Sequence, residues 1–433
     1  MSASSDRHSP ALAFHSKSPV INGKIYGEHH VSSSRHCTFP TFRIVFVLIP
    51  FSLLMTLFTL GFATFLASVT FIRKATPAIA LDSGVGKLPF MGYNTWNAYH
   101  SSDKERFPSG MNNLTDLIHE LGLKAGIYSD SGWFTCQLYP GSFQNEDRDV
   151  KLFQDWGFDL LKYDNCAVPF DEVIKEGMVG KYTRMANAIE RLSKASGKPP
   201  LLFSLCQWGR TTDDIGPDWD ALSSIINQNS FISWASDFYG HNDMDILEVG
   251  NGDLTFEEAK SHFTAWALMK SPLLISTDAS LSKVTNQTLE ILKNTEIIGI
   301  NQDPIIGTGI TPFRWGINPD WSNNYTHPAQ YWSGESENGT VFMLLNVLNE
   351  PADLSFTLTE SPWIRAGRQY AVRDLWSHTD NGTAVRNMTI HNVPTHGVIA
   401  LLLSDAGDEP SGTQPPCARS EWCMDQNGTR IDQ

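Results

Sequence analysis

The sequence predicts an α/β protein, with a (β/α)8-type TIM barrel over residues 81–310 and an antiparallel β-sandwich over 311–404. In the first region, short apolar runs alternate with helical segments, as in the βαβ units of a parallel sheet. In the second, short runs of alternating apolar and polar residues are separated by turn residues, which is typical of antiparallel strands. A long apolar stretch near the N-terminus adds a membrane or signal segment before both domains.

Five apolar runs that end in polar residues are the expected barrel strands. They lie at 88–96, 123–130, 158–165, 200–206 and 271–277. Helical segments lie between them, and several end in Gly, a residue that commonly terminates a helix. No G-x-G-x-x-G motif follows the first run, so the sequence does not support a dinucleotide-binding open sheet.

The sandwich strands are expected where helical periodicity fades, from about residue 312. The runs are TVFMLLNVL, DLSFTLT, YAVRDLW, MTIHNV and GVIALLLS. Turn sequences such as SENGT and TDNGT separate them, as in an all-β domain. The last segment, 405–433, is a polar tail in which Cys417 and Cys423 are expected to close a small loop.

The apolar stretch 44–72 contains no charged residue and is long enough to span a bilayer. More basic residues precede it than follow it directly, so residues 1–42 are expected to stay cytosolic and segment 43–74 to act as an anchor. An A-x-A pattern at 78–80 leaves a second possibility, an oversized signal peptide that is removed. A buried core helix is a weaker interpretation, because core helices are seldom so long and uniformly apolar.

Other features agree with export through the secretory pathway, which would leave a protein that is secreted or anchored with its catalytic domain lumenal or extracellular. Seven N-x-S/T sequons follow the apolar stretch, at Asn113, Asn286, Asn324, Asn338, Asn381, Asn387 and Asn427. Five of the six cysteines also follow it. Because five is odd, at least one thiol stays unpaired if the pairing is intramolecular.

The composition argues against several partners. A net charge of −15 leaves no basic patch for phosphates, so nucleic acid is not expected to bind. Neither C-x-x-C nor a Cys/His set with zinc spacing occurs, so no metal or other cofactor is predicted. Membrane contact is expected only through 44–72, if that segment is not cleaved. The oligomeric state is not indicated.

The stretch LLKYDNC, residues 160–166, is the most informative strand end. It places Lys162, Asp164 and Cys166 at alternate positions, so their side chains are expected on one face of the strand. Active sites of β/α barrels lie at the C-terminal ends of the strands. The other expected strand ends supply aromatic and acidic residues, among them Trp96, Tyr128, Asp130, Asp213, Asp214, Asp243 and Asp245.

Paired carboxylates beside aromatic rings suit glycoside hydrolysis. One carboxylate attacks the anomeric carbon or activates water, and the other protonates the leaving oxygen. Lys162 would keep Asp164 ionised by Coulomb attraction and bond a sugar hydroxyl. On the pattern alone, an ordinary ion pair between Lys162 and Asp164 is an equally good interpretation.

Six motifs together resemble glycoside hydrolase family 27, the retaining α-galactosidases, and most closely the fungal ones. They are MGYNTWNAY, GLKAGIYSDSGWFTCQLYPGS, WGFDLLKYDNC, RTTDDIGPDW, NDMDILEVGNG and ALMKSPLLISTD. They occur in the family's order, and the similarity extends from about Leu81 to Leu403. The resemblance implies a (β/α)8 barrel followed by a β-sandwich, and no cofactor.

The resemblance also implies roles for individual residues. Asp164 corresponds to the nucleophile, and the family's register favours Asp214 over Asp213 as acid/base. Cys136 and Cys166 match a family disulfide. The residues expected to bind the sugar are Trp96, Tyr128, Lys162 and Arg210.

Two segments of the family pattern are missing from this chain. After NTWNAY the family has a helix and a second strand ending in Asp-Asp-Cys, whereas here the chain continues directly into SSDKERFPSG. After CQWG a family loop is also missing, so Gly209 is followed at once by Arg210. A barrel closes only when strand number, tilt and shear agree. The chain is therefore expected to lack the second barrel strand and its Asp pair.

The expected function is hydrolysis of terminal non-reducing α-D-galactose from oligosaccharides, galactomannan or galactolipids, by retaining double displacement. One alternative is a catalytically impaired or inactive carbohydrate-binding relative, because the second strand is absent. Another is an α-N-acetylgalactosaminidase or a β-L-arabinopyranosidase, since the shortened loop after Gln207 would help to select the substrate.

Overall fold

A computed structural model of the chain describes residues 84–99, 108–206, 212, 214–278, 284–317 and 327–411. The chain divides into two units, 1–75 and 76–433, and every described residue belongs to the second. The predicted segments 1–42 and 43–74 lie outside the described residues, as does most of the tail. Within the described ranges, no helix is long and apolar enough to cross a membrane.

Three parallel strands form the sheet that carries the LLKYDNC motif. β2 (Gly126–Asp130) pairs with β3 (Leu160–Asp164), and β3 pairs with β4 (Leu202–Leu205). All three lie within runs that the sequence predicts to be strands. In β3 the side chains of Leu161 and Tyr163 are fully buried, whereas the residues between them are only partly buried, as the period of a strand requires.

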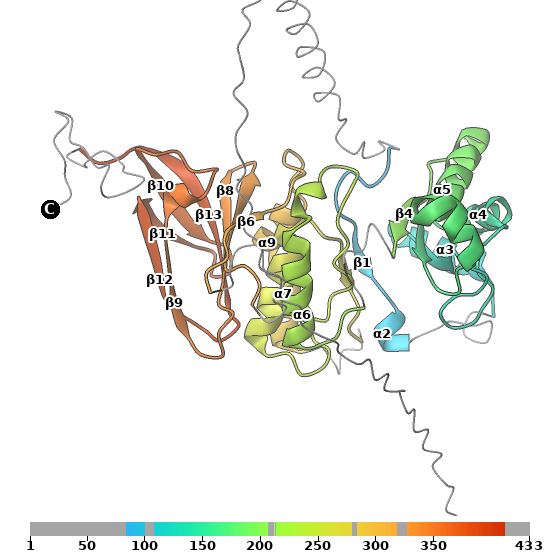
Figure 1. Cartoon of the computed structure of the whole chain (residues 1–433), viewed down its shortest axis with the longest axis horizontal. Helices are drawn as coiled ribbons and strands as arrows, with labels where there is room; N and C mark the ends of the chain where they lie inside the picture. The colour runs from blue at the N-terminus through green and yellow to red at the C-terminus, as the bar shows by residue number, and fades with distance from the viewer. Residues whose placement is uncertain are drawn as a thin grey trace, which may run out of the picture. The chain divides into compact units, whose positions relative to one another are not determined.

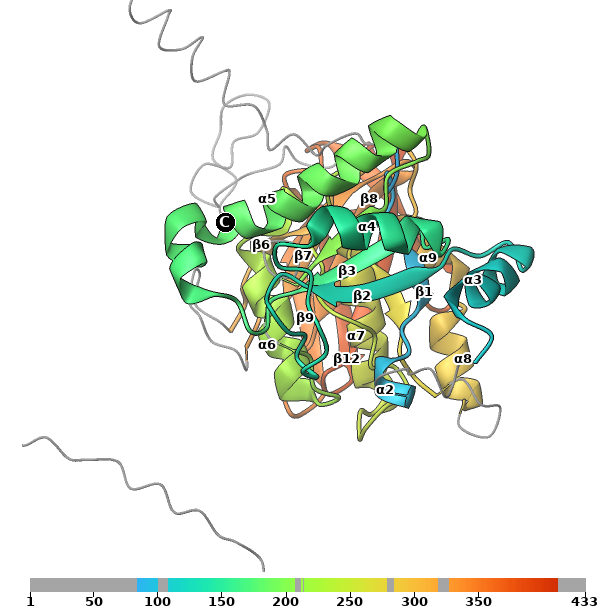
Figure 2. The ribbon, with the colours of Figure 1, turned by 90° about the vertical axis from the view of Figure 1, so that its right-hand side faces the viewer.

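Two helices cover one face of this sheet. α4 (Glu146–Asp155) and α5 (Phe170–Ser196) cross it in Figure 2, and α5 is kinked at Gly177, which has non-helical φ and ψ angles. Apolar side chains of both helices pack with Leu161 and Tyr163 in one cluster. The alternation of strand and helix that the sequence predicts is present in this part of the chain.

A second parallel sheet joins distant parts of the chain. β1 (Met91–Tyr93) pairs with β5 (Leu273–Ile275), and an isolated parallel bridge links Leu247 to Ile275. The helices after β4 are α6 (Trp219–Ser230), the short 3₁₀ helix η1 (Ser233–Ala235), α7 (Phe256–Leu268), α8 (Asn286–Leu292) and α9 (Thr295–Asn301).

In the described part of the chain, β1 of one parallel sheet does not pair with β2 of the other. Among the described residues, β1 pairs only with β5 and β2 only with β3. The elements described between them along the chain are α2 (Trp96–Tyr99) and α3 (Met111–Glu120). All three residues of β1 are exposed. In the described part of the chain, the barrel sheet is therefore open on this side.

The C-terminal region is an eight-stranded antiparallel sheet, which is the strand arrangement predicted for 311–404. The strand order is β6-β7-β8-β13-β10-β11-β12-β9. A 3₁₀ helix, η2 (Leu358–Glu360), follows β9. The bounds are β6 Thr311–Arg314, β7 Tyr331–Ser336, β8 Gly339–Leu345, β9 Ala352–Thr357, β10 Arg368–Asp374, β11 Thr379–Val385, β12 Asn387–Val393 and β13 Val398–Asp408.

Strand β8 is buried on both faces. Val341, Met343 and Leu345 belong to a core that includes α7, whereas Phe342 and Leu344 belong to the core on the other side of the sheet. In Figure 1, α7 and α9 lie next to this sheet, and α7 contacts both β8 and β13. The two regions therefore share a continuous apolar interior.

Helix α7 connects the two regions because nine of its 13 residues are buried and its apolar side chains share a core with those of β8. A capping box fixes its start: the Thr255 hydroxyl accepts from the Glu258 N–H, and the Glu258 carboxylate accepts from the Thr255 N–H. Trp266 is fully buried, and its indole Nε1 donates to the Asp245 carbonyl over 2.8 Å. The helix is thus bonded to the segment between η1 and α7.

Replacing Trp266 by Ala should destabilise the fold by about 3–5 kcal/mol, because it leaves a cavity and an unpaired carbonyl in the core. The change is measured by urea unfolding. Trp234→Ala is the control, since that indole is 75% exposed. If the two variants lost the same free energy of unfolding, the burial of Trp266 in α7 would not be what stabilises the fold.

Candidate active site

Asp164, the last residue of β3, is the centre of the site. The Tyr128 hydroxyl donates to its Oδ2 over 2.6 Å, and the Asn165 N–H donates to its Oδ1 over 2.9 Å. The Cys206 thiol also donates to this carboxylate. Cys136 Sγ lies 3.4 Å from Oδ2, a contact without a proton because this sulfur is in a disulfide.

These contacts decide the charge of Asp164. Burial by itself would raise the pKa of the carboxyl group. The hydrogen bonds from Cys206, Tyr128 and Asn165, together with the charge of Lys162, lower the pKa below its ordinary value. The carboxylate is therefore ionised at neutral pH, which is the state that a nucleophile needs.

Strand register explains why these residues meet. Tyr128 is opposite Lys162, and Asp130 is opposite Asp164. Lys162 is in turn opposite Ser204, two residues before Cys206. Since parallel strands end at the same edge, the polar residues after each apolar run converge there. Burial and the Asp164 charge raise the pKa of Tyr128, so its hydroxyl remains a neutral donor.

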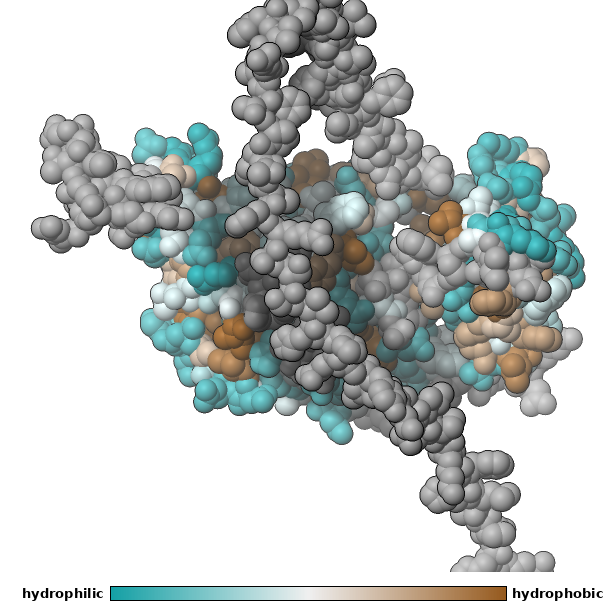
Figure 3. Space-filling model, in the orientation of Figure 1, coloured by the Kyte–Doolittle hydropathy of each residue, from teal (hydrophilic) through white to brown (hydrophobic). Residues whose placement is uncertain are grey.

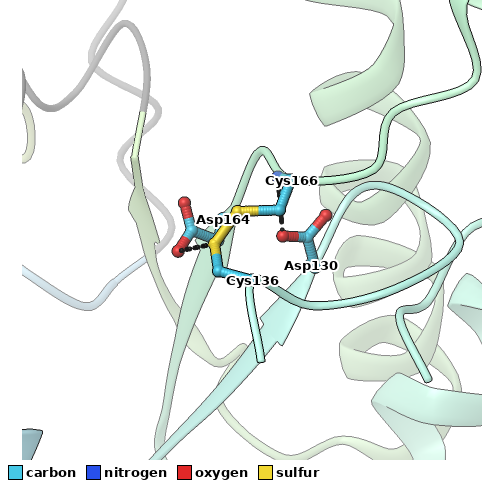
Figure 4. A group of neighbouring side chains, drawn as sticks. All are labelled: Asp130, Cys136, Asp164 and Cys166. Carbon is cyan, nitrogen blue, oxygen red and sulfur yellow. Dashed lines mark hydrogen bonds between the residues drawn. A yellow bond between two sulfur atoms is a disulfide. The ribbon is translucent and has the colours of Figure 1, made fainter. Parts of the chain in front are cut away.

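The disulfide implied by the resemblance is present between Cys136 and Cys166, with a Cα–Cα distance of 5.2 Å. It joins the loop after β2 to the turn after β3, as Figure 4 shows. Asp130, Cys136, Asp164 and Cys166 lie close enough together to suggest a metal site. The disulfide removes both thiolates from that set, however, so the donor set does not suit a soft metal ion.

The loop between Ser131 and Phe143 presents apolar rings and chains to solvent. Trp133, Phe134 and Tyr139 are each about half exposed, and Leu138 is more exposed still. Figure 3 shows hydrophobic areas among hydrophilic ones in the part of the view where Figure 1 draws α3, α4 and α5. The disulfide joins this loop to the turn after Asp164, and exposed aromatic rings there can stack on a sugar.

Of the other predicted site residues, the structure describes Trp96 and Asp214 but not Arg210. Trp96 begins α2 and is 43% exposed. Asp214 is exposed in the segment before α6, where the N–H of the next residue, Ile215, donates to Asp245 Oδ2 over 2.9 Å. Arg210 and Asp213, the less favoured candidate for the acid/base, lie outside the described residues.

A polar network holds α2 near the end of β5. Asn97 Nδ2 donates to Glu248 Oε1 and to Ser276 Oγ, each over 2.8 Å. Asn251 donates to the same two side chains. Trp96, adjacent to Asn97, is thereby tied to the end of β5.

Sequence reasoning missed two residues at the centre of the site. It gave Cys206 no role, yet the Cys206 thiol donates to the Asp164 carboxylate. It placed Asp130 at a strand end but gave it no role, although Asp130 is fully buried opposite Asp164. The signal for both was their position as the last residue of a predicted strand, in the runs 123–130 and 200–206.

Comparison with known proteins identifies the family. A family model described as alpha galactosidase A matches residues 95–303, and one for the alpha galactosidase C-terminal beta sandwich domain matches 326–403. A probable alpha-galactosidase B of Penicillium simplicissimum is 32% identical over 425 residues, with 76% of this chain and 96% of the relative covered. The chain belongs to glycoside hydrolase family 27. The predicted resemblance is therefore confirmed.

Further relatives agree with the family 27 assignment. A probable alpha-galactosidase B of Talaromyces emersonii is 33% identical over 432 residues, covering 76% of this chain and 94% of that one. The crystal structure of alpha-galactosidase I from Mortierella vinacea has a TM-score of 0.65 and 28% identity, covering 76% of this chain and all of the other. These matches confirm the predicted TIM barrel with a C-terminal β-sandwich.

A structure of the Saccharomyces cerevisiae alpha-galactosidase with raffinose shares the fold. Its TM-score is 0.62 at 22% identity, with 75% of this chain and 99% of that chain covered.

The Penicillium relative is longer than this chain in the region that the two share. Their alignment spans 425 residues but contains only 76% of this 433-residue chain, about 330 residues. The family 27 relative therefore has residues at positions where this chain has none.

Replacing Tyr128 by Phe should raise the pKa of Asp164, because a hydrogen bond to the ionised carboxylate is lost. The carboxyl ¹³C resonance of Asp164 in selectively labelled protein, followed against pH, measures this. Tyr139→Phe, an exposed ring on the adjacent loop, is the matched control and should leave the titration unchanged. An unaltered pKa in Tyr128→Phe would show that this bond does not hold the charge.

Proposed function

We propose that this family 27 chain hydrolyses terminal α-D-galactose residues from α-galactosides, with retention of configuration. The observation that carries the proposal is the setting of Asp164. Its carboxylate lies at a strand end beside Lys162, receives hydrogen bonds from Tyr128 and Cys206, and is held ionised. The printed names of the fungal relatives, alpha-galactosidase B, support the same substrate class.

The proposed reaction has two steps. An Asp164 oxygen attacks the anomeric carbon, and Asp214 gives a proton to the leaving oxygen as the glycosidic bond breaks. Asp214, now a carboxylate, then removes a proton from water, and the resulting oxygen displaces Asp164 from the sugar. Net retention requires the two carboxyl groups to be about 5–5.5 Å apart. No redox partner is needed in either step.

The remaining residues would bind the galactose ring. Lys162 and Arg210 would hold sugar hydroxyls, while Trp96 and Tyr128 would form a wall of the pocket. Oligosaccharides are the first substrates to test, since the Saccharomyces cerevisiae enzyme was solved with raffinose. Galactomannan and galactolipids are further candidates. Family 27 also contains a β-L-arabinopyranosidase, so an arabinopyranoside belongs in the same assay.

The full chain should release nitrophenol from p-nitrophenyl α-galactopyranoside. Asp164→Asn should reduce kcat at least roughly a thousandfold, because the covalent step is lost. Asp214→Asn should reduce it about 10²- to 10⁴-fold, the usual value of general acid–base catalysis. Asp353→Asn, on the sandwich, is the control and should retain wild-type turnover. A folded Asp164→Asn chain with unchanged turnover would contradict the mechanism.

A second candidate function is sugar binding with little or no catalysis. It is supported by the unpaired edges of β1 and β2 among the described residues and by the positions that this chain lacks relative to the Penicillium enzyme. The missing Asp pair would have made hydrogen bonds of about 1.5–3 kcal/mol each. In the same assay this candidate predicts no nitrophenol but measurable galactose binding. Inserting the relative's segment after Tyr99 should then restore turnover.

We also propose that the catalytic region is exported. The Cys136–Cys166 disulfide supports this, since disulfides persist in oxidising compartments. Protein recovered from a eukaryotic host should carry N-glycans. Treatment with an endoglycosidase should therefore increase its mobility on a denaturing gel. Replacing all seven sequon asparagines by Gln is the control and should remove that change. Unglycosylated protein that accumulates in the cytosol would contradict export.

A further inference from the structure

Asp130 is a buried acidic residue with no role in the reaction described above. It ends β2 directly opposite Asp164, and its side chain is fully buried. Oδ1 accepts a hydrogen bond from the Gly132 N–H over 2.7 Å. Oδ2 accepts one from the Cys166 N–H over 2.8 Å. One carboxylate therefore holds backbone groups that are 34 residues apart in the sequence.

The two segments held by Asp130 are the ones that the disulfide also joins. Cys136 lies on the loop after β2, and Cys166 lies on the turn after Asp164. Figure 4 shows the Asp130 carboxylate on one side of the disulfide and the Asp164 carboxylate on the other. A covalent and a hydrogen-bonded link therefore act in parallel.

Further backbone contacts hold the loop on the nucleophile. The Ser131 N–H and hydroxyl both donate to the Asp164 carbonyl, over 3.0 and 2.8 Å. At Gly132 the approach is so close that a Cβ atom would lie 2.1 Å from the Cys166 carbonyl oxygen. Any shift of this loop therefore moves the backbone of Asp164 and the sulfur that contacts its carboxylate.

We propose that Asp130 is a positioning residue for the nucleophile Asp164. Its carboxylate fixes the loop after β2 and the turn after β3 to each other, which sets the direction of the Asp164 side chain. The inference rests on the proposed function, because it takes Asp164 as the nucleophile. Asp130 itself touches no reacting atom.

The charges around Asp130 make its action dependent on pH. The charges of Asp164 on β3 and Lys181 on α5 act on Asp130, and the Asp130 charge acts in turn on the hydroxyl groups of Tyr128 and Tyr163. Burial raises the pKa of Asp130 to about 6, in spite of the two backbone hydrogen bonds. Below that pH the carboxyl group gains a proton. One of its oxygens then accepts only a weakened hydrogen bond from the Gly132 or the Cys166 N–H. Activity should therefore fall as the pH drops through about 6.

Lys181 supplies the opposing positive charge. Its side chain is 2% exposed, and Nζ has no hydrogen-bond partner among the residues that the structure describes. It lies 4.5 Å from the centre of the Tyr182 ring. Its charge acts on Asp130, Cys206 and Asp164. For Asp130 this positive charge opposes the effect of burial on the pKa, in addition to the hydrogen bonds from the Cys166 and Gly132 N–H groups.

The test compares Asp130→Asn with Asp303→Asn in the full chain. Asp303 is the matched control: it is 5% exposed and accepts from the N–H groups of Ile305, Ile306 and Glu337, but it lies outside the site. Asp130→Asn should lower kcat about 10- to 100-fold with little change in KM, as expected for a displacement of about 1 Å. In a plot of kcat against pH, the Asp130→Asn variant should not show the fall in activity that the wild-type chain shows near pH 6. Asp303→Asn, corrected for folded fraction, should keep the wild-type kcat and profile.

Equal losses in the two variants, or an Asp130→Asn chain that keeps the step near pH 6, would overturn the proposal. If Asp130→Asn does not fold, the wild-type chain with its disulfide reduced provides the second test. It should stay active at pH 7.5, where the Asp130 link remains, and should lose activity more steeply than the oxidised chain below about pH 6. Parallel profiles for the oxidised and reduced chains would overturn the proposal.

Failure of the proposed function is recognised separately. It would appear as a folded wild-type chain that releases no nitrophenol. The two aspartate variants are then compared through the ¹³C titration of Asp164. Loss of the Asp130 charge alone would lower the pKa of Asp164, whereas loss of the positioned hydrogen bonds would raise it. A raised pKa in Asp130→Asn and an unchanged one in Asp303→Asn would support positioning without catalysis. A lowered or unchanged pKa in Asp130→Asn would overturn it.

Discussion

The register of β3 between β2 and β4 is the constraint on which the site depends. It sets Tyr128 beside Lys162 and Asp130 beside Asp164, with Cys206 one residue after the end of the next strand. A slip of one residue would turn every side chain of β3 to the opposite face. Packing against the helices fixes the register, because Leu161 and Tyr163 must point into the core formed with α4 and α5. Packing on one side of the sheet thus determines chemistry at its edge.

Charge balance at this edge is a second consequence of that register. Two carboxylates on neighbouring strands, one of them fully buried, would repel each other in a medium of low dielectric constant. The protein offsets this repulsion with backbone N–H groups on Asp130 and with hydroxyl, thiol and N–H donors on Asp164. The result is a difference between the two acids. The pKa of Asp130 is raised, and that of Asp164 is lowered.

Much of this architecture is predictable from the sequence, because local pattern determines it. The polar ends of runs 123–130 and 158–165 indicate both the strands and the residues at the site. The sandwich runs indicate β8, β9, β10, β12 and β13, but β6 and β7 contain too little alternation to be recognised. The prediction of a turn at TDNGT is wrong, because these residues begin β11. Asp130 and Cys206 could not be assigned roles, since burial and hydrogen bonding across strands are tertiary properties. The disulfide pairing came from family resemblance alone, because spacing does not determine which cysteines meet.

The two-faced burial of β8 bears on how the chain can be divided. Val341, Met343 and Leu345 contribute to the same interior as Trp266, so half of one sandwich strand is core for the barrel region. Cutting the chain near residue 310 would leave that side of α7 in water and would leave β8 half covered. The C-terminal region is therefore a structural wall of the catalytic region rather than a detachable module. The two should melt together as one cooperative unit, and neither should be transferable to another protein without the other.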